Sequence, residues 1–141
     1  MIIDSHCHLN YEPMSMSLNE TIDRANKGGV KYLLTISTED KSFNKILKII
    51  SDYECVYGTY GIHPHEAKKH LMVDTKHIVQ KISMNKKIIG IGETGLDFYY
   101  NHSDSKDQIN SFEKHTEAAQ MTNLPLIVHT RDAEKTTLEI L

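Results

Sequence analysis

The chain has 141 residues, a length that suits one compact domain with its own core. A net charge of −3 and an ordinary charged fraction of 25% exclude a basic surface that would by itself attract nucleic acid or an anionic membrane. No apolar run approaches the roughly 18 residues of a membrane span. The first residues lack the basic segment of a signal peptide, and the two cysteines suit free thiols. We therefore expect a cytoplasmic protein that does not enter a membrane.

Apolar runs alternate with segments of helical periodicity along the whole chain. The runs predict strands at residues 1–5, 30–37, 55–60, 88–92 and 124–128. Helices are expected after them, over about 18–27, 39–53 and 74–84, from 105 past 119, and over 132–141. Capping-box patterns at Ser17–Glu20 and Ser105–Gln108 mark the starts of the first and fourth helices. Near-continuous apolar strands are typical of a parallel sheet covered on both faces, so we expect one α/β domain over residues 1–141. The pattern fits a doubly wound open sheet or part of a (β/α)8 barrel.

Two histidines, His6 and His8, directly follow the first predicted strand. Side chains alternate along a strand, so both imidazoles lie on one face together with Asp4, and Cys7 points the other way. Neutral imidazole is the commonest protein ligand for a metal ion. We therefore expect His6 and His8 to hold a metal, Asp4 to orient an imidazole, and Cys7 to be a small core residue.

Further polar residues follow the later strands: His63 the third, Glu93 the fourth and His129 the fifth. The carboxyl ends of parallel strands meet at one edge of a sheet, so these side chains should lie close together at that edge. Glu93 lies among glycines and can bridge two cations roughly 4 Å apart, the arrangement used for phosphodiester cleavage. Arg131 shares the face of His129. His63 precedes Pro64 and can instead belong to a turn.

Other candidates have simpler interpretations. Tyr99 and Tyr100 can stack on a base or ribose, or simply pack the loop after the fourth strand. The remaining histidines fall in loops or on helices, and we expect them to be exposed to solvent: His65, His70, His77, His102 and His115.

Four stretches carry a resemblance to a known family. They are Asp4-Ser5-His6-Cys7-His8-Leu9, Gly61-Ile62-His63-Pro64-His65, Ile91-Gly92-Glu93-Thr94-Gly95-Leu96-Asp97-Phe98-Tyr99, and Leu124-Pro125-Leu126-Ile127-Val128-His129-Thr130-Arg131-Asp132-Ala133. In this order and spacing the chain resembles the TatD-type metal-dependent deoxyribonucleases, which belong to the amidohydrolase-like TIM barrels. The resemblance implies the N-terminal portion of such a domain, an incomplete (β/α)8 barrel with about five parallel strands alternating with helices.

The resemblance also implies a function and a set of site residues. The expected activity is hydrolysis of DNA phosphodiester bonds, often from the 3′ end, with two divalent ions such as Mg, Mn or Zn. By resemblance, His6 and His8 bind the first metal, Glu93 bridges both and acts in catalysis, and His129 binds the second. His63 and Arg131 then lie near the substrate phosphate.

The family's barrel needs roughly 250 residues, and two more of its ligands, a later histidine and an aspartate, would lie beyond residue 141. An open barrel exposes strand edges and an apolar inner face, so we expect low stability and self-association or pairing with a complementary C-terminal fragment. We also expect the chain alone to bind metal weakly and catalyse poorly. The alternatives are a non-catalytic remnant or split-enzyme half that binds metal or a partner chain, and an amidohydrolase acting on an amide or lactone. Glu93 disfavours the last, since many such enzymes use a carbamylated lysine on the fourth strand.

Overall fold

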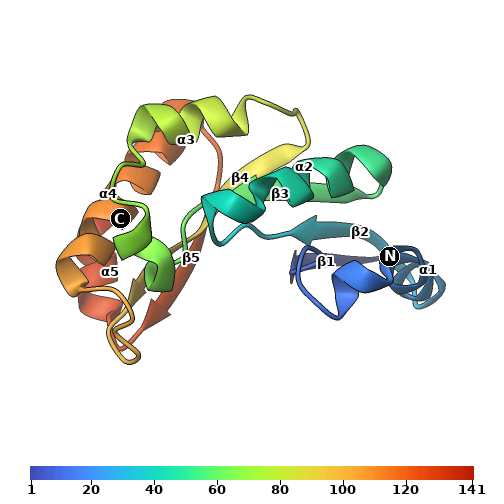
Figure 1. Cartoon of the computed structure of the whole chain (residues 1–141), viewed down its shortest axis with the longest axis horizontal. Coiled ribbons are helices and arrows are strands. Elements are labelled where there is room, and N and C mark those ends of the chain that lie inside the picture. The colour runs from blue at the N-terminus through green and yellow to red at the C-terminus, as the bar shows by residue number, and fades with distance from the viewer.

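The structure, a computed structural model, describes residues 1–141. Five strands form one parallel sheet: β1 (Ile2–Cys7), β2 (Val30–Thr35), β3 (Val56–Tyr60), β4 (Ile88–Asp97) and β5 (Leu126–Arg131). Their order in the sheet is β1-β2-β3-β4-β5, so each strand pairs with its sequence neighbour (Figure 1). A doubly wound sheet reverses direction at a switch point, whereas a barrel adds strands in sequence. The order therefore selects the barrel segment, and five parallel strands alternating with helices are confirmed.

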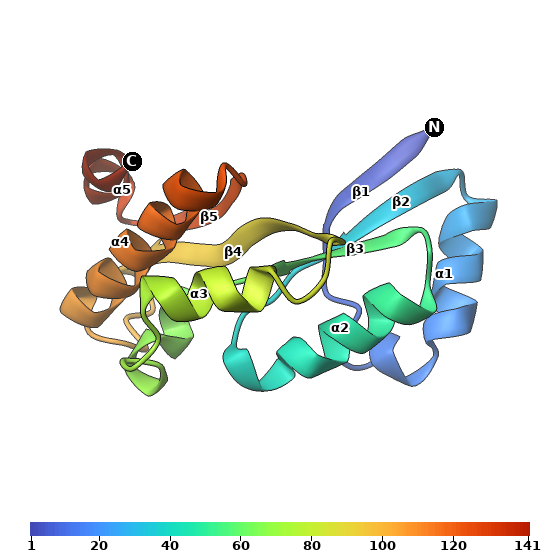
Figure 2. The same cartoon turned by 90° about the horizontal axis from the view of Figure 1, so that it is seen from above.

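The helices connect successive strands. They are α1 (Leu18–Lys27), α2 (Phe43–Asp52), α3 (Thr75–Ile82), α4 (Ser105–Thr122) and α5 (Glu134–Ile140). Three short 3-10 turns, which the sequence patterns did not predict, are η1 (Met14–Met16), η2 (Asp40–Ser42) and η3 (Pro64–Lys69). Helices α1, α2 and α3 lie along one side of the curved sheet, as Figure 2 shows. The sheet's other face is left without a helical layer.

Some details of the predicted elements are wrong for identifiable reasons. Neither predicted capping box forms, because Ser17 makes no side-chain cap bond and Asp104, not Ser105, occupies the N-cap position of α4. The fourth strand was predicted to end at residue 92, yet β4 continues to Asp97. The added residues pair with β5, from Thr94 opposite Val128 to Asp97 opposite Arg131. This pairing depends on a partner strand about thirty residues away in the sequence. The residues after Gly92 therefore show no apolar pattern from which the longer strand could be predicted.

The main core lies between the sheet and the helices. Phe43 and Tyr60 are fully buried and meet edge to face with ring centroids 4.8 Å apart. Cys7 is half-buried and packs against this cluster, and its thiol donates to the carbonyl of Leu34 at 3.3 Å. Burial, assisted by the nearby charge of Asp4, raises the pKa of the Cys7 thiol to about 12. The thiol therefore stays protonated, as befits a packing residue rather than a metal ligand.

The face of the sheet without helices carries exposed apolar side chains. Ile3 and Tyr32 are 58% and 44% exposed, and with Tyr57 and Ile89 they border a mostly apolar hollow of about 280 Å³. Contiguous apolar surface of this kind usually marks a contact with another chain or segment. The exposed inner face expected for an open barrel is thus present. None of the helices combines the length and the apolar character that crossing a membrane would require.

Candidate metal centre

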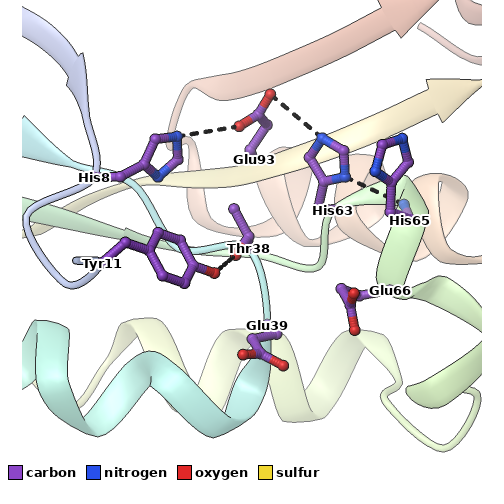
Figure 3. A pocket seen from close by; sticks show the side chains of 8 residues that line it. All are labelled: His8, Tyr11, Thr38, Glu39, His63, His65, Glu66 and Glu93. Carbon is purple, nitrogen blue, oxygen red and sulfur yellow. Dashed lines mark hydrogen bonds and ion pairs between the residues drawn. The ribbon is translucent and has the colours of Figure 1, made fainter. Parts of the chain in front are cut away.

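Glu93, on β4, is the meeting point of the strand-end histidines. Its Oε2 lies 3.4 Å from His6 Nε2 and 4.0 Å from His8 Nε2. Its Oε1 lies 3.8 Å from His63 Nε2 and 3.3 Å from His129 Nδ1. The Glu93 side chain is only 12% exposed, and Figure 3 shows its carboxylate between His8 and His63. The predicted convergence of these residues on one mouth is therefore observed.

The donor set fits divalent cations. Nitrogen and oxygen ligands bind zinc at about 2.0–2.2 Å, so two ligands of one tetrahedral ion lie roughly 3.3–3.6 Å apart. The contacts of Glu93 with its histidines span 3.3 to 4.0 Å and divide into two groups, each able to hold an ion: His6, His8 and Glu93, and His63, Glu93 and His129. One carboxylate oxygen belongs to each group. This is the arrangement that a bridging carboxylate requires.

Glycines around Glu93 allow β4 to approach β5 closely. Gly92 and Gly95 have φ of +134° and +131°, and a Cβ at either would lie within 2.4 Å of a β5 carbonyl oxygen, that of Ile127 or His129. A side chain at either position would push the strands apart and carry Glu93 away from His129. Glycines beside a site residue can also leave room for an ion or a ligand. In the structure, the room is taken by the β5 backbone.

Hydrogen bonds at the far ring nitrogens distinguish His8 from His63. His8 Nδ1 lies 3.3 Å from the carbonyl oxygen of Ile36, which can only accept, so Nδ1 carries the proton and Nε2 turns a lone pair towards Glu93. His63 Nδ1 instead accepts from the backbone N–H of His65 at 3.2 Å. Neutral His63 therefore points an N–H towards Glu93, which suits a hydrogen-bond donor better than a metal ligand. Burial lowers the pKa of His63 to about 4, so it is neutral near pH 7.

Asp97 and His65 belong to the site, although neither was singled out from the sequence. His65, predicted to be exposed, donates from Nε2 to Asp97 Oδ2 at 2.8 Å. His129 Nε2 lies 3.0 Å from the same oxygen. Although burial opposes ionisation of Asp97, hydrogen bonds from the Tyr100 N–H and from both imidazoles hold its pKa at about 2. Asp97 and Glu93 are four residues apart on β4, so their side chains lie on the same face of the strand. The sequence would have indicated this only if the fourth strand had been predicted to continue beyond residue 92.

The other histidines predicted to be exposed differ in their burial. His102 is exposed, and His70 and His77 are partly buried. His115 is buried with 1% exposure, so that prediction is wrong. It lies on the inward side of α4, where its Nε2 accepts from the backbone N–H of Ile62 at 3.1 Å.

Asp4 and Arg131 lie at the edge of the site. The Asp4 carboxylate accepts from the backbone N–H of His6 at 3.1 Å, so its contact is with the strand and not with an imidazole. The guanidinium carbon of Arg131 lies 4.2 Å from the ring centroid of Tyr99 and 4.6 Å from that of Tyr100. These tyrosines therefore hold the exposed Arg131 by cation–π contacts.

A polar cavity of about 280 Å³ opens beside Glu93. Figure 3 shows the side chains that line it: His8, Tyr11, Thr38, Glu39, His63, His65, Glu66 and Glu93. Tyr11 and Thr38 are hydrogen-bonded to each other through their hydroxyls. The cavity gives a small polar group access to the Glu93 side chain.

Comparison with known proteins assigns the family. The sequence model described as "TatD related DNase" matches residues 3–141. The chain belongs to the TatD family. It is 34% identical over 99% of its length to an uncharacterized metal-dependent hydrolase of Buchnera aphidicola subsp. Acyrthosiphon pisum, covering 56% of that protein. It is 31% identical over its full length to YabD of Bacillus subtilis, also named an uncharacterized metal-dependent hydrolase, covering 55% of it.

The solved structures agree with the fold. The TatD homologue YJJV of Escherichia coli superposes with a TM-score of 0.90 at 27% identity, over 98% of this chain and 54% of that one. A TatD-family hydrolase of Entamoeba histolytica, at 21% identity, shares the fold with a TM-score of 0.88, over 99% of this chain and 52% of that one. The predicted incomplete (β/α)8 barrel is thereby confirmed. The chain spans about half the length of the TatD relatives that it matches.

Proposed function

We propose that this chain supplies the N-terminal wall of a two-metal centre that hydrolyses DNA phosphodiester bonds, acting from the 3′ end. The observation that carries the proposal is the Glu93 carboxylate, which turns one oxygen to His6 and His8 and the other to His129. The family description "TatD related DNase" supports it, as does a relative from Shigella flexneri named a 3′-5′ ssDNA/RNA exonuclease. That relative is 26% identical over 99% of this chain and 54% of its own length.

The residues have separate roles in this proposal. His6 and His8 bind one divalent ion, Mg, Mn or Zn, His129 binds the other, and Glu93 holds both. The bound ions would supply a water of lowered pKa and the positive charge that a chain of net charge −3 lacks at this mouth. Glu93 would contribute to catalysis by holding both ions.

Two residues are proposed to contact the substrate phosphate. The N–H that His63 points towards Glu93 can donate to a phosphate oxygen. The Arg131 guanidinium, held on Tyr99 and Tyr100, offers a planar pair of donors next to His129 on β5. Asp4 is proposed to hold the backbone of His6, and through it the ring.

The activity is proposed to depend on a second chain or segment. The exposed inner face around Ile3, Tyr32 and Ile89 has the apolar character of a surface that is covered in use. Either a second copy or a complementary C-terminal fragment would cover it, and a fragment would also bring further metal ligands. Metal binding without turnover by the chain alone would favour the split-enzyme or non-catalytic reading.

The test uses 3′-labelled single-stranded DNA with Mg²⁺ or Mn²⁺. Glu93→Gln removes the charge that holds both ions. We expect a loss of about 100-fold or more, since changing a residue that merely supports a metal ligand already costs about 10- to 100-fold. The matched control is Glu113→Gln on the exposed side of α4, which should leave the rate unchanged. Measurable digestion that is equal for wild type and Glu93→Gln would show that the activity does not come from this site.

A further inference from the structure

We propose that Asp97 is a positioning residue that presents His129 Nδ1 to the metal as a bare lone pair. This inference rests on the proposed metal centre but concerns the hydrogen bonds behind it. A histidine that binds a metal must offer an unprotonated nitrogen, and the partner of its other nitrogen decides which one is free. Asp97 is that partner for His129, and it also holds His65.

The contacts of Asp97 define the proton positions. An ionised carboxylate only accepts, so His129 Nε2 at 3.0 Å and His65 Nε2 at 2.8 Å from Oδ2 must both carry protons. A neutral imidazole has a single N–H, which leaves His129 Nδ1 unprotonated. That nitrogen lies 3.3 Å from Glu93 Oε1, on the side where the ion would bind.

Hydrogen bonds define the position of the ring proton for three of the histidines around Glu93, and that position differs among them. His8 and His129 donate their far N–H, to the carbonyl of Ile36 and to Asp97, and turn a lone pair inwards. His63 accepts at its far nitrogen and turns an N–H inwards. On the Oε1 side of Glu93, Asp97 thus makes His129 the ligand, while the His65 backbone leaves His63 as the donor.

The Asp97 carboxylate is itself held in place. Its side chain is fully buried, and Oδ1 accepts from the Tyr100 N–H at 2.9 Å. Gln108 of α4 accepts from the Asp97 backbone N–H at 2.7 Å and donates to its carbonyl at 3.0 Å. A second donation by Gln108, to the Ser103 carbonyl at 2.7 Å, fixes the amide. With every partner satisfied, the carboxylate has no alternative position, which is what positioning requires.

A purely structural role would also explain a buried aspartate at the end of a strand. In that case Asp97 would tie the loop at Tyr100 to β4, and the tautomer of His129 would not depend on it. Asp97→Asn separates the two roles, because Asn keeps an acceptor and the size of the side chain. Its NH₂ group would face an imidazole nitrogen and favour a lone pair at Nε2, which moves the proton to Nδ1.

The first measurement is the ¹⁵N NMR of the imidazoles in the full, metal-free chain. We expect Nε2–H for His129, His65 and His63 in wild type, and a change to Nδ1–H at His129 in Asp97→Asn. An Nδ1–H tautomer of His129 in wild type would overturn the inference, even if the variant failed to fold. So would an unchanged tautomer in a folded variant.

The second measurement is calorimetric titration with Mn²⁺ or Zn²⁺ alone. Asp97→Asn should weaken one of two binding events by about 10- to 100-fold and leave the other unchanged. The matched control is Asp40→Asn, which removes another aspartate that accepts from a histidine, His77 at 3.2 Å, outside the metal site. Equal weakening of both events, or of neither, would overturn the inference. If wild type takes up no metal, the proposed function fails, while the NMR result still decides the role of Asp97.

Discussion

Acidification should destabilise this protein through His115. Its Nδ1–H donates to the Ser111 carbonyl at 2.7 Å and its Nε2 accepts from the Ile62 N–H at 3.1 Å, so both ring nitrogens are already used. Protonating Nε2 would set two donors against each other in a site with 1% exposure. Burial is the largest cause that lowers the pKa of His115 from 6.5 to about 4.

The pKa shift sets the sign and the size of the effect. A histidine whose folded pKa is depressed contributes stability that is present above its unfolded pKa, near 6.5, and is lost as the pH falls through about 4. A shift of this size corresponds to a loss of roughly 3 kcal/mol of stability, most of it between roughly pH 7.5 and roughly pH 4.5. His63, whose pKa is also lowered to about 4, adds to the loss in wild type.

Urea unfolding of wild type and His115→Gln at both pH values isolates the contribution of His115. The variant is expected to be less stable at neutral pH but to lose about 2–3 kcal/mol less on acidification than wild type does. His102→Gln, at an exposed histidine, should keep the wild-type difference between the two pH values. If acidification destabilises His115→Gln as much as wild type, the buried neutral imidazole is not the cause and the reasoning is refuted.

Two further predictions concern the core and the inner face. Phe43→Ala removes a fully buried ring that packs on Tyr60 and should lower the free energy of unfolding by about 3–5 kcal/mol in a urea titration. The control is Met72→Ala, at a side chain that is 94% exposed, which should change this free energy by less than about 0.5 kcal/mol. Equal effects would place the core elsewhere. Tyr32→Glu puts a charge on the exposed inner face and should reduce self-association in sedimentation velocity; a wild-type monomer with a sharp thermal transition would contradict the proposed contact.

Much of the fold follows from local patterns. The apolar runs place all five strands, and the helical periodicities place the helices between them. Element ends were less predictable. Ser17 is the N-cap residue of α1 as its pattern predicts, but Ser105 is the first residue of α4 and not its cap, and β4 continues beyond its apolar run. The choice between an open doubly wound sheet and a barrel segment needed the strand order, which depends on how distant strands pair.

The chain itself determined the outline of the candidate site. His6, Glu93 and His129 lie in the second half of a strand, and His8 and His63 come after one. The shared edge of a parallel sheet brings such positions together whatever the other contacts are. Only the tertiary structure decided what each imidazole does. The partner of a ring nitrogen comes from elsewhere in the chain, as Asp97 does for His129 and Ile62 for His115. The sequence around a histidine therefore does not show which of its ring nitrogens carries the proton.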